Sequence, residues 1–258
     1  MKKAGLIITA IMLVLALVGA FWTPYSHTAV SYDRLQGPSA KHILGTDNFG
    51  RDILSRIMKG MGTTMSIAFL TVAIGAFLGT LIGAVTGYYG GWVDRILMRF
   101  NDAVTAFPTF LLALLIVSIV GPGSKYSVVI ALSLVFIPGF ARVMRSEYAF
   151  LANRNFVISA RLMGAGDARI MFRYLLPNTT RTLLPALTIG FNNAVLAEAG
   201  LSFLGIGVSP PDASLGYMLS ESQSLIVSAP WYVLSVGLAI VLLVFGVGLI
   251  GEGSKADA

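Results

Sequence analysis

The stretch Ile158–Asn178 reads ISARLMGAGDARIMFRYLLPN, and it lies in a chain that is otherwise mostly apolar. It carries three arginines, Arg161, Arg169 and Arg173. The GAG at its centre (Gly164, Ala165, Gly166) interrupts a helical pattern, because glycine permits the turned backbone that a helix end needs. We therefore expect a helix, a turn and a second short helix, all outside the bilayer.

Each of the two predicted helices has an apolar side. In the first, Phe156, Ala160 and Met163 recur at i, i+4 and i+7 and form one stripe. The second begins at Asp167, whose carboxylate suits the free amides of a helix N-terminus. One face of this helix is expected to hold Ile170 and Tyr174, and another is expected to hold Arg169 and Arg173. Pro177, which follows Leu176, is expected to end the helix.

A loop that folds into its own unit usually carries function, so this one is expected to dock a soluble partner. The alternative is that its arginines only fix the orientation of the membrane spans.

Composition places the chain among membrane proteins. Of its 258 residues 56% are hydrophobic and only 12% are charged, about half of the ~25% found in soluble domains. The net charge is +6, and the basic residues lie between the apolar runs. Contacts with lipid headgroups and the orientation of the spans explain this excess of positive charge, so no nucleic-acid partner is expected. The chain has no cysteine and only two histidines, which excludes disulfides, thiol catalysis and a Cys-ligated or His-rich metal site.

Six apolar runs are long enough to cross about 30 Å of hydrocarbon. They are continuous rather than alternating, so an all-α polytopic membrane protein with six transmembrane helices is expected rather than a barrel. The first run also resembles a signal peptide, but it is longer than the usual 7–15 apolar residues, which favours a retained helix. The predicted spans are Ala4–Trp22, Thr64–Tyr88, Ala103–Val120, Tyr126–Ala141, Leu183–Gly207 and Trp231–Ile250.

These spans divide the chain into an N-terminal helix (1–22), an external loop (23–63), a core (64–250) with a cytoplasmic loop at 142–182, and a short tail (251–258). An even number of spans places both termini on one side. Most basic residues fall on the side of Lys2 and Lys3, which predicts that both termini are cytoplasmic. The segment DILSRIMKGM, from Asp52 to Met61, fits an amphipathic helix lying on the headgroups.

The external loop contains GTDNFGRD, a run rich in turn-forming residues. Gly45 and Gly50 suit the turns, and Asp47, Arg51 and Asp52 supply charges. We expect a structural elbow in which the charges pair and cap the next helix. A ligand or metal site is the alternative, but the spacing of the carboxylates does not support a metal.

The fifth predicted span holds polar residues. Glu198, Ser202 and Gly205 fall at i, i+4 and i+7, and Asn192 lies further up the same span. An intramembrane acid is costly and tends to face a bundle interior or a cavity. Two interpretations stay open: a residue of a transport pathway, or helix packing through small residues and a hydrogen-bonding carboxyl.

Two further features concern packing. The second span carries Gly75, Gly79, Gly83 and Gly87, a ridge that lets another helix approach closely, within this chain or in a partner. Two prolines within or beside spans either kink helices or break them at the membrane edge, namely Pro108 and Pro138.

Three motifs together resemble one family. FVISARLMGAGDARIMFRYLLPN, with Ala160, Gly164, Leu176 and Pro177, resembles the cytoplasmic signature of ABC-importer permeases. HILGTDNFGRDILSR (His42–Arg56) and EAGLSFLGIGVSPP (Glu198–Pro211) are similar to the dipeptide, oligopeptide and nickel branch of that family.

The resemblance implies a type I ABC-importer permease fold in a bacterial or archaeal cytoplasmic membrane. It implies as partners a second related permease, two cytoplasmic ATPases and an extracellular or periplasmic substrate-binding protein. The short helix near Asp167–Leu175 would then be the coupling helix, seated on one ATPase. Peptides are the first expectation for cargo, with nickel or a metallophore-bound metal next.

No set of residues supports bond-making chemistry, so an enzyme is not expected. The chain lacks a Gly-rich phosphate loop with Lys-Ser/Thr, so ATP and magnesium are expected on partner subunits and no cofactor on this one. The alternative function is a secondary transporter driven by an ion through Glu198. Such folds usually show an internal repeat and more intramembrane charge than this chain has.

Overall fold

The computed structural model describes residues 2–256, with side chains as far as Gly253. Within this range the chain is all-α, as predicted, and its only β pairing consists of two isolated bridges, Thr46 with Asp52 and Gly123 with Val208. The predicted tail is helical as far as Ala256, because the last helix continues through it. Met1 and residues 257–258, which belong to the predicted first and last segments, lie outside the described residues.

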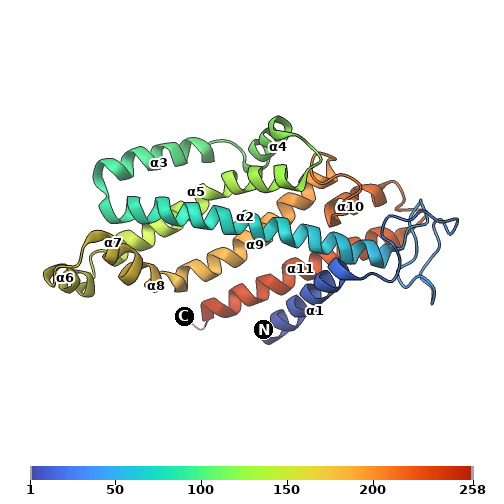
Figure 1. Cartoon of the computed structure of the whole chain (residues 1–258), viewed down its shortest axis with the longest axis horizontal. Coiled ribbons are helices and arrows are strands. Elements are labelled where there is room, and N and C mark those ends of the chain that lie inside the picture. Colours follow the sequence, from blue (N-terminus) through green and yellow to red (C-terminus); the bar gives the residue numbers. More distant parts are fainter. Residues whose placement is uncertain (1, 257–258) are drawn as a thin grey trace.

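Long helices run back and forth between two ends of the molecule (Figure 1). One end holds residues 22–52 and α10 (Leu215–Gln223), and the other holds the short helices between α5 and α9. The described ends of α1 and α11 both point towards the second end, as an even number of crossings requires. The helices that run between the ends are α1 (Lys2–Phe21), α2 (Ile53–Tyr89), α3 (Gly91–Thr105) with α4 (Thr109–Val120), α5 (Lys125–Leu151), α9 (Thr180–Phe203) and α11 (Pro230–Ala256).

Among the described residues, α1, α2, α5 and α11 are each long and apolar enough to cross a membrane, and α3 with α4 makes a fifth candidate span. α9 has 24 residues, enough for a crossing. It carries Asn192, Asn193 and Glu198, which lower its hydropathy. Length and composition thus support four or five of the six predicted spans.

The third predicted span is not one straight helix. α3 and α4 meet at an angle of 86°, and the break contains Phe107 and Pro108. A proline disfavours the helical conformation of the residue before it, and it has no N–H to continue the helix. The prediction of a continuous Ala103–Val120 helix was therefore wrong.

The second predicted span begins earlier than expected, because α2 already starts at Ile53. The segment predicted to lie on the headgroups forms the first turns of α2, and its Ile57, Met58 and Met61 are buried. A Cβ placed on Gly19 of α1 would lie 2.7 Å from Met58, so α1 packs directly on these turns. The apolar side of the segment contacts protein rather than lipid.

The glycine ridge of α2 packs against α5 of the same chain. A Cβ on Gly79 would lie 2.5 Å from Cβ of Phe140, and one on Gly83 would lie 2.6 Å from the carbonyl oxygen of Ala141. Only glycine allows the two backbones to approach this closely. The ridge thus fixes α2 and α5 as one rigid pair that supports both ends of the molecule.

Candidate functional site

The docking loop was predicted over 142–182 and is shorter in the structure, because α5 continues to Leu151 instead of ending at Ala141 and α9 begins at Thr180. The docking loop is therefore residues 152–179, and it begins with α6 (Asn155–Leu162). Gly164 has a φ of +80° and ends this helix. The N–H of Ala165 donates to the carbonyl oxygen of Ala160 at 3.0 Å, and that of Gly164 donates to Arg161 at 2.9 Å. This pair of bonds is a Schellman cap, which requires a left-handed residue at the glycine position. The predicted turn after the first helix is confirmed.

The second half of the docking loop is helical throughout. α7 (Asp167–Arg169) starts at the predicted residue and continues into the π-helix η1 (Ile170–Leu175) and α8 (Leu176–Asn178). Pro177 does not end the helix, contrary to the prediction. It lies in α8, directly after the π-helix η1, and the chain continues helically through it towards α9.

The loop is held to the bundle by buried apolar side chains. Val157 and Ala160 of α6 are buried, whereas Phe156 and Met163 are exposed, so the predicted stripe was wrong except at Ala160. In a helix of eight residues two overlapping stripes are possible, and contact with the bundle selects the one that contains Val157. The loop contributes Val157, Ala160, Ile170, Met171 and Leu175 to a cluster with Ala84, Tyr88, Met144, Tyr148 and Leu151 of α2 and α5.

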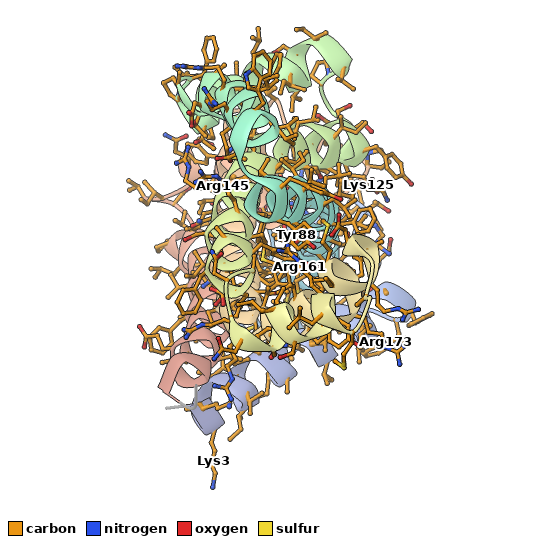
Figure 2. All side chains as sticks on the ribbon, turned by 90° about the vertical axis from the view of Figure 1, so that its left-hand side faces the viewer. Lys3, Tyr88, Lys125, Arg145, Arg161 and Arg173 are labelled. Atoms are coloured by element: carbon orange, nitrogen blue, oxygen red, sulfur yellow. The ribbon has the colours of Figure 1, made fainter. Side chains whose placement is uncertain are left out.

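Two tyrosines of the bundle fasten the docking loop. The hydroxyl of Tyr88 donates to Oδ1 of Asp167 at 2.6 Å, and that of Tyr148 donates to the carbonyl oxygen of Met171 at 3.2 Å. The guanidinium of Arg161 lies 5.2 Å from the centre of the Tyr88 ring, and Figure 2 shows the two side chains next to each other. Hydrogen bonding to Tyr88 raises the pKa of Arg161 above its usual range. The role of Tyr88 was not predicted, because in the sequence this residue is simply the last one of an apolar span.

The outermost part of the loop is apolar and exposed. Leu162 is 85% exposed and Met163 is 79% exposed, and both lie at the end of α6, the helix farthest from the centre of the molecule in Figure 1. Arg169, Phe172 and Arg173 are exposed as well, while Tyr174 and Leu176 are half-buried. The predicted cationic face is therefore present, next to an apolar tip.

The GTDNFGRD motif forms an elbow at the opposite end of the molecule. Gly45 and Gly50 have φ values of +79° and +73°, as tight turns require. Asp47 accepts hydrogen bonds from the backbone N–H of Phe49 and of Arg51. Its Oδ2 also accepts from Nε of Arg51 at 2.7 Å and from Nη1 of Arg56 at 2.6 Å.

The elbow is joined to the last third of the chain. Arg51 and Arg56 donate to the two oxygens of Glu221 in α10, at 2.9 and 2.6 Å, and Arg56 also donates to the hydroxyl of Tyr232 at 2.9 Å. Asp52 caps α2 by accepting from the N–H of Ser55 at 2.8 Å. The predicted structural elbow is confirmed. No cluster of three metal-ligating side chains occurs among residues 2–256 where side chains are described.

Glu198 is completely buried between helices. Its Oε1 accepts from the hydroxyl of Ser202 at 2.7 Å and its Oε2 from the hydroxyl of Thr64 at 2.8 Å. Thr64 also accepts from the N–H of Leu215, so the cluster joins α2, α9 and α10. This geometry favours the packing interpretation of Glu198 and Ser202.

The other predicted polar residue of α9, Asn192, lies beside α11, since a Cβ on Gly248 would be 3.3 Å from its Nδ2. Its neighbour Asn193 instead lines a groove of about 380 Å³ between α4, α5 and α9, together with Thr105, Thr109 and Phe136. The groove beside Asn193 is open, whereas Glu198 is buried.

Comparison with known proteins settles the class of the chain. Residues 79–252 match the family described as the binding-protein-dependent transport system inner membrane component. This chain belongs to that family. It is a permease subunit of an ABC importer and not an enzyme, because ATP hydrolysis in this family is carried out by separate ATPase subunits. It is a multi-pass membrane protein.

The permease is similar to curated proteins over nearly its whole length. The dipeptide transport system permease protein DppC of Alkalihalophilus pseudofirmus is 40% identical over 252 residues, which are 97% of this chain and 83% of that protein. The glutathione transport system permease protein GsiD of Pectobacterium atrosepticum is 40% identical over 255 residues, or 96% and 84% of the two chains.

A solved structure shows the same fold. A chain of the methionine ABC transporter MetNI in an inward-facing conformation superposes with a TM-score of 0.65 at 21% identity, covering 79% of this chain and 96% of that one. The type I ABC-importer permease fold predicted from the motifs is confirmed.

Proposed function

We propose that this permease passes short peptides across the cytoplasmic membrane of a bacterium or archaeon. The support is the similarity of the whole chain to proteins named for dipeptide and glutathione transport, both of which are small peptides. None of the relatives reported above is named for nickel, so a metal cargo is not favoured. The groove beside Asn193 offers an open surface for the cargo path, which a second permease would complete.

The docking loop is proposed to couple the permease to an ATPase subunit. The observation that carries this proposal is the exposed apolar tip, Leu162 and Met163, on a loop whose base is buried against α2 and α5. Exposed apolar side chains next to cationic ones are typical of a protein interface. Because the base is fastened by Tyr88 and Tyr148, a force on the tip reaches α2 and α5 directly.

This assignment refines the predicted coupling helix. The apolar side of the segment Asp167–Leu175 holds the loop to the bundle through Ile170, Met171 and Leu175. The end of α6 projects farther, so we infer that Leu162 and Met163 make the central contact with the ATPase. Arg169 and Arg173 then lie at the rim of the contact.

The orientation follows from the same proposal. The described ends of α1, which begins with Lys2 and Lys3, and of α11 point towards the end of the molecule that holds the docking loop, and that end is then cytoplasmic. The positive charge on that end agrees with the positive-inside rule. The elbow and α10 face outwards, towards the substrate-binding protein.

Exposed positions allow a test that does not disturb folding. Leu162→Asp with Met163→Asp is expected to abolish both co-purification of the ATPase subunits and peptide uptake, because a carboxylate at the centre of an apolar contact is buried without a partner. Val227→Asp is the control, since Val227 is 93% exposed and lies between α10 and α11, away from the docking loop. Retention of the ATPases by the tip variant would refute the docking proposal. Peptide uptake is measured in a separate experiment, with dipeptides as the transported substrate.

A further inference from the structure

The helix α3 presents two different faces. Its inner face is polar and contacts α5: Asp94 accepts from Nη2 of Arg145 at 2.5 Å, and Nδ2 of Asn101 donates to the carbonyl oxygen of Pro138 at 3.1 Å. These bonds fix the rotation of α3 about its own axis. The opposite face is consequently directed away from the bundle.

The outer face of α3 combines aromatic and cationic side chains. Trp92, Arg95, Ile96, Arg99 and Phe100 line a shallow groove of about 290 Å³. Trp92 is 71% exposed and Phe100 is 70% exposed. We call this set the α3 outer face.

The two arginines of the α3 outer face have no acidic partner. Both acidic residues of α3 are occupied elsewhere, Asp94 by Arg145 and Asp102 by Arg142. Among the residues whose side chains are described, no ion pair involves Arg95 or Arg99. Two adjacent uncompensated positive charges favour an anionic ligand.

The position of α3 indicates where that ligand comes from. α3 follows α2 after Gly90 and lies along the edge of the bundle, at the end that holds the docking loop (Figure 1). Tryptophan is enriched at the level of lipid headgroups, and arginine places its stem on apolar surface with its head among polar groups. The side chains of the α3 outer face are of the kinds that suit the boundary between acyl chains and headgroups.

We propose that the α3 outer face binds one anionic glycerophospholipid. Arg95 and Arg99 are one helical turn apart and both reach a single phosphate, to which guanidinium groups donate paired hydrogen bonds. Trp92, Ile96 and Phe100 contact the acyl chains. A zwitterionic lipid binds less well, because its ammonium group is repelled by the same two arginines. This lipid site goes beyond the proposed function, since neither the cargo nor the ATPase takes part in it.

The test uses the purified permease complex and native mass spectrometry, with phosphatidylglycerol as the probe. The variant Arg95→Gln with Arg99→Gln is expected to bind about 30-fold more weakly, because a basic residue at a membrane surface contributes about 1 kcal/mol and two contribute about 2 kcal/mol. The control, Arg34→Gln with Arg181→Gln, removes two exposed arginines elsewhere and is expected to bind as the unaltered complex does.

Several results would overturn the lipid site. One is that the variant and the control bind phosphatidylglycerol equally. Another is that the unaltered complex binds phosphatidylcholine as tightly as phosphatidylglycerol. A third is displacement of the lipid by millimolar inorganic phosphate, which would indicate a simple anion site. Loss of the partner permease from the variant complex would show that the face is a protein interface.

A second measurement keeps the unaltered sequence. A photoreactive phosphatidylglycerol is expected to crosslink within residues 91–100, and crosslinks confined to other segments would contradict the proposal even if the arginine variant failed to assemble.

Discussion

At the residue scale, the buried carboxyl of Glu198 gives the clearest test of mechanism. Glu198→Ala leaves the hydroxyls of Thr64 and Ser202 without their acceptor, at a cost of about 1–3 kcal/mol. Glu198→Gln keeps the size of the side chain and one acceptor oxygen, and its NH2 group can donate to the other hydroxyl. We expect a lowered thermal midpoint for the Ala variant in the purified complex, and near-normal stability and peptide uptake for the Gln variant. Loss of uptake in a stable Gln variant would instead support an ion-carrying carboxyl.

The bonds that the sequence predicted correctly at this scale are short-range. Asp47 and Asp52 bind groups within a few residues, so turn chemistry alone indicates them. Glu198 and Thr64 are 134 positions apart, and Tyr88 and Asp167 are 79 apart. Periodicity carries no information about such partners, which is why the role of Glu198 stayed open and Tyr88 was missed.

At the scale of elements, the contact between α2 and α5 depends on the glycine ridge. Gly83→Ala introduces a methyl group that meets the backbone of α5, and such overpacking typically costs about 1–3 kcal/mol. Gly237→Ala in α11 is the control, because nothing lies within 4 Å of its new methyl group. We expect a lower thermal midpoint for the first variant only. Equal midpoints would show that α2 and α5 are not held together by close backbone approach.

Helix boundaries were less predictable than helix existence, and the prolines show why. Pro108 lies at the break between α3 and α4, whereas Pro138 lies inside α5 without ending it. The same residue type has opposite outcomes because Pro138 is buried between packed helices and its carbonyl oxygen accepts from Asn101, a residue of another helix. The start of α2 was likewise predicted too late, since the packing partners of its first turns come from distant segments.

At the scale of the whole molecule, α2 connects two ends. At one end is a buried ion network of Arg56 with Asp47 and Glu221, which we call the lock, and at the other end is the docking loop. Arg56 and Tyr88 are separated by about 50 Å of continuous helix at 1.5 Å per residue. Arg56 is buried and binds Asp47, Glu221 and Tyr232, which belong to the elbow, α10 and α11.

Arg56→Met removes the more deeply buried of the two arginines that bind both Asp47 and Glu221, while Arg51 keeps its bonds to both. Removing one partner from a buried ion network costs up to about 3–5 kcal/mol, and the remaining Arg51 places the expected cost at the lower end of that range. We expect a markedly lower thermal midpoint and rapid proteolysis within residues 22–52. The ATPase subunits should still co-purify, because the docking loop is fastened separately at the far end of α2. Arg34→Met, which removes an exposed arginine of the same elbow, is the control. If the two variants were equally stable, the lock would not hold the outer end together. If Arg56→Met released the ATPases, the two ends would be energetically coupled through α2.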